Sequence, residues 1–240
     1  MNNLKNINIQ IYGDGANKET IAKLSQKKWI SGFTTNPSLM SSEGIKNYIQ
    51  YSKEIIDASN NKPISFEILS DELNEMYDQA IIIAKWSDNV FVKIPIVNSK
   101  GESTSEIIKR LSEENINLNI TSVFTIEQVG EAMESLNYSD NSIISIFAGR
   151  IADTGVDPEK IIKESSELLK IEKSKSKLLW ASSREIFNIF QAQRSGADII
   201  TVSHDLINKM ELIGKDLNEF SLETSRMFVE DAAKSLFEIN

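Results

Sequence analysis

The 240-residue sequence contains no cysteine, which excludes both a disulfide framework and a cysteine-based zinc site. No apolar run comes near the roughly 18 residues that a membrane-spanning helix needs. Residues 1–11 are polar and rich in asparagine, without the apolar core of a signal peptide. We therefore expect a soluble, cytoplasmic protein, and the lack of cysteine is consistent with a reducing compartment.

An excess of positive charge is missing as well. The chain has 26 Lys and Arg against 35 Asp and Glu, a net charge of −9. A protein that binds a polyanion usually carries a basic stripe, and none is visible. The charge thus argues against nucleic acid and anionic membranes as partners. The hydrophobic content of 40% and the charged content of 25% are ordinary for a globular protein, and the length fits one large domain or two small ones.

Short β-branched runs alternate along the chain with longer amphipathic stretches. The predicted strands cover residues 7–13, 30–35, 62–68, 89–95, 116–121, 142–148, 176–182 and 198–203. Helical spacing of apolar residues is clear in segments 71–86, 103–114 and 157–170. Eight such units predict either a (β/α)8 barrel or a doubly wound sheet. Their number and regular spacing favour an α/β fold with a single TIM barrel over residues 1–214.

The last segment, residues 215–240, lies beyond the eighth unit. Apolar residues recur through its stretch 215–238, which predicts an additional C-terminal helix. On a lone barrel much of that apolar surface would be exposed. We therefore expect the helical extension to pack on the barrel or on a neighbouring subunit of a homo-oligomer.

Polar residues interrupt the predicted strands near their C-terminal ends, where a barrel interior is otherwise filled with bulky apolar side chains. Period two places these residues on one face and their apolar neighbours on the other, as for Lys93 between Val92 and Ile94. Because the C-terminal ends of the strands converge on one pocket, the polar set should meet there. Its members are Asp14, Glu67, Lys93, Asn119, Thr121 and Ser145.

These residue types predict a particular chemistry. An amine enclosed among apolar side chains has its charged form disfavoured, and the neutral amine can attack a ketone to form a Schiff base. The iminium then accepts electrons from a breaking carbon–carbon bond. One lysine and two separate carboxylates suit the proton transfers that both steps require. Arg150 and Arg184, just beyond two strands, could fork onto a phosphate.

At these residues the sequence resembles the transaldolase family. Five motifs carry the resemblance, in order along residues 9–230: GFTTNPS at 32–38, VKIP at 92–95, INLNIT at 116–121, ISIFAGRI at 144–151, and WASSR at 180–184 with GAD at 196–198. Any one of them could arise by chance, but five in register are specific.

The resemblance implies transfer of a dihydroxyacetone unit between sugar phosphates without metal or organic cofactor, as in the pentose phosphate pathway. Sedoheptulose 7-phosphate and glyceraldehyde 3-phosphate would give erythrose 4-phosphate and fructose 6-phosphate. By this resemblance Lys93 forms the Schiff base, Asp14 is the acid/base, and Glu67 and Thr121 hold a catalytic water. The positions implied to bind substrate are Thr35, Asn36, Asn119, Ser145, Phe147, Arg150, Ser182 and Arg184. Short members of the family are often ring-shaped oligomers.

The family also contains lyases that cleave fructose 6-phosphate and release free dihydroxyacetone. Those lyases tend to carry Gln at the position of Glu67 and Tyr at that of Phe147, and they lack the amide of Asn119. At all three positions this sequence resembles the transferases. A lyase stays the first alternative, and a catalytically silent barrel that binds sugar phosphates is the second. Gly13 departs from the family pattern, which has a larger residue there, and predicts a wider pocket floor.

Simpler interpretations exist for each position. Lys93 could reach water from a strand edge, and Glu67 could merely pair with it. Asp14 could cap the following helix, and Asn36 could serve only the turn that precedes Pro37. Arg150 and Arg184 could form surface ion pairs. The single histidine, His204, follows the last strand and is expected at the surface rather than in catalysis.

Overall fold

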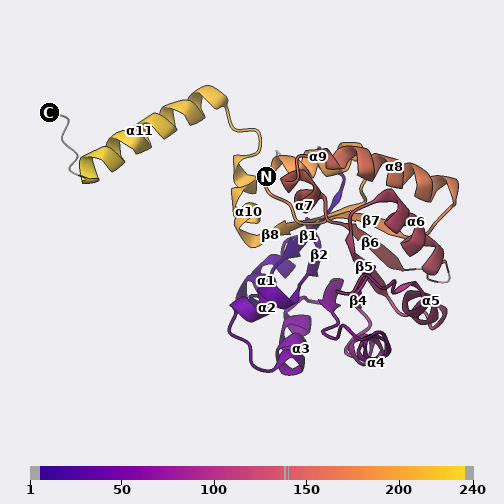
Figure 1. Cartoon of the computed structure of the whole chain (residues 1–240). Helices are drawn as coiled ribbons and strands as arrows, with labels where there is room; N and C mark the ends of the chain where they lie inside the picture. Colours follow the sequence, from indigo (N-terminus) through magenta and orange to yellow (C-terminus); the bar gives the residue numbers. More distant parts are fainter. Residues whose placement is uncertain (1–5, 138, 140, 236–240) are drawn as a thin grey trace.

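A computed structural model describes residues 6–137, 139 and 141–235 (Figure 1). Eight parallel strands form a closed barrel in chain order, with the first paired to the eighth. The TIM barrel predicted from the sequence is thereby confirmed, and closure rules out the doubly wound sheet. The strands are β1 (Gln10–Asp14), β2 (Ile30–Thr34), β3 (Ile64–Glu67), β4 (Val90–Pro95), β5 (Leu118–Val123), β6 (Ser142–Ile146), β7 (Lys177–Trp180) and β8 (Ile199–Ser203).

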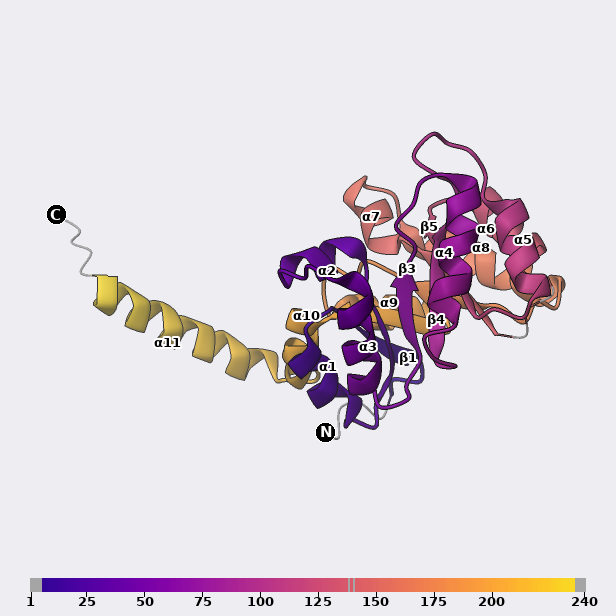
Figure 2. The same cartoon turned by 90° about the horizontal axis from the view of Figure 1, so that it is seen from below.

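Helices follow the strands and cover the outside of the barrel (Figures 1 and 2). They are α1 (Lys18–Ser25), α2 (Pro37–Ser42), α3 (Tyr48–Ala58), α4 (Leu73–Ala84), α5 (Ser105–Glu113), α6 (Ile126–Ser135), α7 (Ala148–Asp153), α8 (Pro158–Ile171), α9 (Phe187–Ser195), α10 (His204–Asn208), the 3-10 helix η2 (Lys209–Leu212) and α11 (Leu217–Ser235). Polar side chains cap the first turn of many of them, where free N–H groups need acceptors. These caps are Asn17, Asn36, Asn47, Thr125, Asp157 and Ser203.

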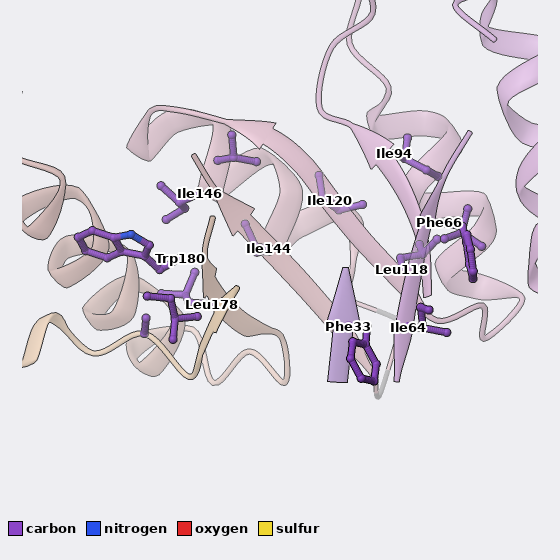
Figure 3. Packing of buried hydrophobic residues seen from close by; sticks show 14 of the residues in the cluster. Phe33, Ile64, Phe66, Ile94, Leu118, Ile120, Ile144, Ile146, Leu178 and Trp180 are labelled. Atoms are coloured by element: carbon purple, nitrogen blue, oxygen red, sulfur yellow. The ribbon is translucent and has the colours of Figure 1, made fainter. Parts of the chain in front are cut away.

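Two apolar clusters result from the period-two alternation along the strands. The larger one lies between the strands and the helices, and Figure 3 shows part of it, including Phe66, Ile120 and Trp180. The smaller one fills the barrel interior, as expected for this fold. Its residues are Tyr12, Phe91, Ile143, Leu179, Ala181 and Ile199, with Phe147 packed against them. The polar residues lie next to this interior cluster, nearer the C-terminal ends of the strands.

The C-terminal ends of three strands lie two residues away from the sequence-based expectation. β5 continues to Val123, past a bulge in its pairing with β6, where Ser122 has a left-handed φ of 57°. β6 ends at Ile146, and the short helix α7 begins two residues later. β7 ends at Trp180, and Ser182, two residues later, has a left-handed φ of 61°.

The C-terminal helix exists, but it does not pack on the barrel. α11 points away from the other elements in both views (Figures 1 and 2). None of its residues is buried among those that the structure describes, and the expected end of the helix at 236–238 lies outside them. Packing of the extension on a neighbouring subunit stays a prediction.

Candidate active site

The polar residues of the strands converge at the C-terminal end of the barrel. Strand register places Glu67 beside Lys93, and Lys93 beside Asn119. A cavity of about 700 Å³ opens above them. The predicted site residues that line it are Asp14, Asn36, Glu67, Lys93, Ser145, Phe147, Arg150 and Ser182. Side chains from β1, β3, β4 and β6 thus meet in one space, as the alternation pattern predicted.

Lys93 is held by two acceptors at the bottom of this cavity. Its Nζ donates a hydrogen bond of 3.0 Å to Glu67 Oε2 and one of 2.8 Å to the carbonyl oxygen of Thr35. The side chains of Lys93 and Glu67 are only 9% and 17% exposed. Lys93 therefore does not reach bulk water from a strand edge. A carboxylate in direct contact with the amine can take its proton, so the ion pair is compatible with a chemical role.

Asn119 and Thr121 lie below the cavity rather than on its surface, and both are fully buried. Ser145 Oγ donates to Asn119 Oδ1 over 2.6 Å, and Asn119 Nδ2 donates to Ser65 Oγ over 3.1 Å. This chain fixes the orientation of the amide. Thr121 Oγ1 is buried without a hydrogen-bond partner among the described residues, so its hydroxyl has the capacity for a further hydrogen bond.

The side chains of Thr35 and Asn36, at the end of β2, form hydrogen bonds with the backbone. The Thr35 hydroxyl donates to the Ser65 carbonyl over 2.9 Å, away from the cavity, and only its own carbonyl reaches Lys93. Asn36 Oδ1 accepts from the backbone N–H of Leu39 and caps α2. The turn interpretation of Asn36 is confirmed. Its side chain also lines the cavity, so a contact with substrate is not in conflict with the cap.

Asp14 stands across the cavity from Lys93, at the end of β1. The cap of α1 is Asn17, so Asp14 is free of the helix-capping duty considered for it. Burial raises the pKa of the Asp14 carboxyl, while the hydrogen bond from Thr34 and the charges of Lys93 and His204 act in the opposite direction. A carboxyl shifted in this direction is suited to exchange protons with a substrate hydroxyl.

A second, smaller cavity of about 510 Å³ lies beside Asp14. Arg150 comes from α7, where its guanidinium lies 5.7 Å from the centre of the Phe147 ring, and Arg184 follows β7. Ser182 lines the same cavity. Two cations and a hydroxyl can hold a phosphate.

Arg184 forms the ion pair that was considered for it. Its Nε lies 3.1 Å from Asp153 Oδ1, and its Nη2 contacts Oδ2 of the same carboxylate. This contact raises the pKa of the guanidinium and lowers that of Asp153. Because both side chains are about half exposed, the pair contributes little to stability. One edge of the guanidinium is therefore occupied by Asp153, and Arg184 also lines the smaller cavity.

Two sequence-based expectations near Asp14 are wrong. Gly13 does not widen the pocket floor, because a side chain there would meet Phe33 and Leu24 in the outer layer. His204 is not a surface residue in a loop. It begins α10, is half-buried, and lies so close to Gly15 that a Cβ on that glycine would collide with the imidazole ring. Burial lowers the pKa of His204.

Sequence reasoning missed several residues of the cavity. Thr201 lines it and stands between Ile200 and Val202, so it follows the alternation that revealed the others. Thr34 also lines it; the sequence indicates this threonine as a polar residue at the end of the second strand, but no role was predicted for it. The rim was missed as well. There the loop after β4 folds back in an antiparallel bridge between Val97 and Ser103.

This loop is fixed to the loop after β3. Ser99 N donates to Asp71 Oδ1 over 2.8 Å, and the Ser99 hydroxyl donates to Oδ2 over 2.5 Å. The polar turn directly after the fourth strand was the only sequence signal for it.

Comparison with known proteins agrees with this geometry. Residues 11–239 match the family described as Transaldolase/Fructose-6-phosphate aldolase. The chain belongs to this family. A relative from Streptococcus equi subsp. zooepidemicus, named a probable transaldolase, is 33% identical over 94% of this chain and 98% of its own length. Another from Dehalococcoides mccartyi with the same name is 34% identical, over 84% of this chain and 90% of its own. These names suggest an enzyme of the transaldolase type.

Solved structures resemble the chain in fold alone. An HpcH/HpaI aldolase/citrate lyase family protein from Burkholderia cenocepacia aligns with a TM-score of 0.56 at 9% identity, over 97% of this chain and 98% of its own. A structure titled "Native KDPGal structure" aligns with a TM-score of 0.55 at 13% identity, over 82% and 84% of the two chains. Within the described part of the family member, no helix is long and apolar enough to cross a membrane.

Proposed function

We propose that the protein is a transaldolase that moves a dihydroxyacetone unit between sugar phosphates through a Schiff base on Lys93. The observation that carries the proposal is the enclosed Lys93–Glu67 contact facing Asp14 across one cavity. The sugar-phosphate substrates proposed are those that the resemblance implies, sedoheptulose 7-phosphate or fructose 6-phosphate as donor and an aldose phosphate as acceptor. The chemistry requires neither a metal nor an organic cofactor.

The first half of the reaction joins the donor to Lys93. Glu67 takes a proton from the ammonium at 3.0 Å, and the free amine attacks the carbonyl carbon of the ketose. The carbinolamine hydroxyl receives a proton and leaves as water, which gives the iminium. The buried Thr121 hydroxyl and Glu67 are suited to hold that water. Asn36, Asn119 and Ser145 would bind the dihydroxyacetone portion.

The second half breaks and remakes a carbon–carbon bond. Asp14 takes the proton of the hydroxyl on the carbon that is released, the bond to the neighbouring carbon breaks, and its electron pair moves into the iminium to form an enamine. The released aldose departs, and the enamine attacks the acceptor aldehyde. Asp14 then returns its proton to the new hydroxyl, and water hydrolyses the regenerated iminium, which releases the new ketose and restores the amine of Lys93. Arg150, Arg184 and Ser182 would hold the phosphate of each partner in the smaller cavity.

The experiment that tests transfer follows glyceraldehyde 3-phosphate released from fructose 6-phosphate, with and without erythrose 4-phosphate. A transferase releases one glyceraldehyde 3-phosphate per active site without acceptor. Further release then requires erythrose 4-phosphate and is proportional to the amount of that acceptor consumed. Equal steady-state release without acceptor would identify a lyase instead. No release under either condition, together with no covalent adduct, would identify a silent barrel that binds sugar phosphates.

Replacing Phe147 with tyrosine should increase release of free dihydroxyacetone. The Phe147 ring lines the cavity beside the barrel's interior cluster, 5.6 Å from the Phe124 ring. It cannot donate a proton, whereas a phenol can help to protonate the enamine carbon, after which water hydrolyses the iminium and releases dihydroxyacetone. We expect acceptor-free release to rise about tenfold or more. Phe124→Tyr is the matched control. An unchanged rate of dihydroxyacetone release in Phe147→Tyr would contradict the proposal that Phe147 favours transfer over release.

We further propose that α11 packs against a second copy of the chain. Its apolar side chains are exposed, including Leu217 at 79%, Phe228 at 62% and Val229 at 71%. Such a surface is typical of a segment buried in an oligomer. A chain that ends at residue 214 should therefore sediment as a monomer while the full chain sediments as an oligomer. Phe228→Asp should weaken the assembly and Glu230→Gln should not. A monomeric full chain would contradict this proposal.

A further inference from the structure

Asp14 is linked to two threonines that have no place in the mechanism above. β1 and β2 pair so that Thr34 lies directly opposite Asp14. Thr34 Oγ1 lies 2.7 Å from Asp14 Oδ1 and 2.5 Å from Thr201 Oγ1, which comes from β8 on the other side. Thr34 and Thr201 are 3% and 4% exposed. The two hydroxyls are therefore almost fully buried, and they form a hydrogen-bonded chain with the carboxylate of Asp14, which lines the cavity.

The direction of this chain follows from the number of protons. An ionised carboxylate only accepts hydrogen bonds, so Thr34 must donate to Asp14. Thr34 has a single hydroxyl proton, so it must accept from Thr201. If Asp14 gains a proton on Oδ1, that proton can point to Thr34, and the chain can reverse. The arrangement of the hydroxyls is thus coupled to the protonation state of Asp14.

We propose that Thr34, with its hydroxyl oriented by Thr201, is a positioning residue that keeps Asp14 ionised and fixes the oxygen that faces the substrate. This rests on the proposed acid/base role of Asp14. The bond to Thr34 occupies Oδ1 and leaves Oδ2 for the substrate hydroxyl. Because a hydroxyl that accepts a hydrogen bond becomes a better donor, Thr201 strengthens the contact.

The charges around Asp14 are not sufficient to keep its carboxyl ionised. Lys93 from β4 and His204 from α10 favour the ionised carboxylate, whereas Glu67 from β3 and burial disfavour it. The charges of Lys93 and Glu67 are paired with each other. The pKa of His204 is lowered by burial, so that ring contributes little positive charge near neutral pH. Thr34 is the side chain whose hydrogen bond to Asp14 offsets the burial of the carboxyl.

The pH dependence of kcat for the transfer reaction tests the proposal. In Thr34→Val, the acidic limb should move up by about one pH unit, because the ionised carboxylate loses a charge-assisted hydrogen bond. Thr34→Ser keeps the hydroxyl, so its acidic limb should lie at the same pH as in the unmodified protein. In Thr201→Val a smaller shift in the same direction is expected. Borohydride trapping of a ketose on Lys93 should stay at the level of the unmodified protein in all three variants, because the amine and Glu67 are untouched.

Other outcomes would overturn the proposal. An acidic limb that stays in place in Thr34→Val, with normal trapping, would show that Thr34 does not act on Asp14. Loss of the limb in His204→Gln would assign it to the imidazole instead. Equal effects of Thr34→Ser and Thr34→Val would reduce the role of Thr34 to packing. Lack of trapping in the unmodified protein would overturn the proposed function itself, and with it the role of Thr34.

Discussion

Replacing Lys93 with methionine is expected to lower the transfer rate by at least about 10⁴-fold, because no other lysine lines the cavity among the residues that the structure describes. Lys93→Arg is expected to be equally inactive, although it keeps a cation beside Glu67. The two variants should differ in stability. Methionine leaves the Glu67 carboxylate enclosed without its partner at 3.0 Å, whereas arginine can still pair with it. Steady-state rates and thermal unfolding of both variants check these statements.

A surface ion pair supplies the control for Lys93. Lys18 and Glu54 are separated by 2.9 Å, as in the buried pair, but both side chains are more than a third exposed. Lys18→Met breaks an ion pair between lysine and glutamate outside the cavity. The transfer rate of this variant should therefore stay within about twofold of that of the unmodified protein. If Lys93→Arg retained activity comparable to that of Lys18→Met, Lys93 would act only as a cation.

Asp14→Asn should lower kcat by about 10²- to 10⁴-fold while leaving Schiff-base formation intact. Asparagine accepts a hydrogen bond from Thr34 but cannot take the proton of the substrate hydroxyl. Borohydride reduction in the presence of the donor should therefore still trap an adduct on Lys93. Single-turnover kinetics would then show fast adduct formation and slow cleavage.

The pH profile gives the second half of this test. Burial raises the pKa of Asp14, and the base must be ionised to act. Activity is therefore present above that pKa and is lost as the pH falls through it, so the acidic limb should lie above the ordinary aspartate value of 3.8. The limb should be missing in Asp14→Asn. A limb that persists there, or a variant that loses trapping and cleavage together, would contradict the role assigned to Asp14.

Much of the fold and the centre of the site follow from local patterns. Alternation along β4 and β5 is sufficient to place Lys93 and Asn119 on the barrel axis, because a strand side chain has only two faces to choose from. The parallel register then brings neighbouring strands together without further information. Closure of the barrel was less certain, since it depends on the pairing of β1 with β8 at opposite ends of the chain.

The parts that could not be predicted depend on contacts between distant segments. The pairing of Arg184 with Asp153 joins the loop after β7 to the end of α7, 31 residues away in sequence, and no spacing rule indicates it. The packing of His204 on Gly15 depends on how α10 docks beside β1. The helix α7 was missed because its six residues directly follow β6 and carry no capping signal. Thr201, in contrast, followed the same alternation as the predicted residues and could have been found.

The most direct test of the account is borohydride reduction of the full-length protein with fructose 6-phosphate, followed by mass spectrometry of its peptides. The account predicts a reduced adduct on the peptide that contains Lys93, with no comparable adduct on the other lysines. No adduct at all, or an adduct on another lysine with Lys93 unmodified, would contradict Schiff-base catalysis at Lys93.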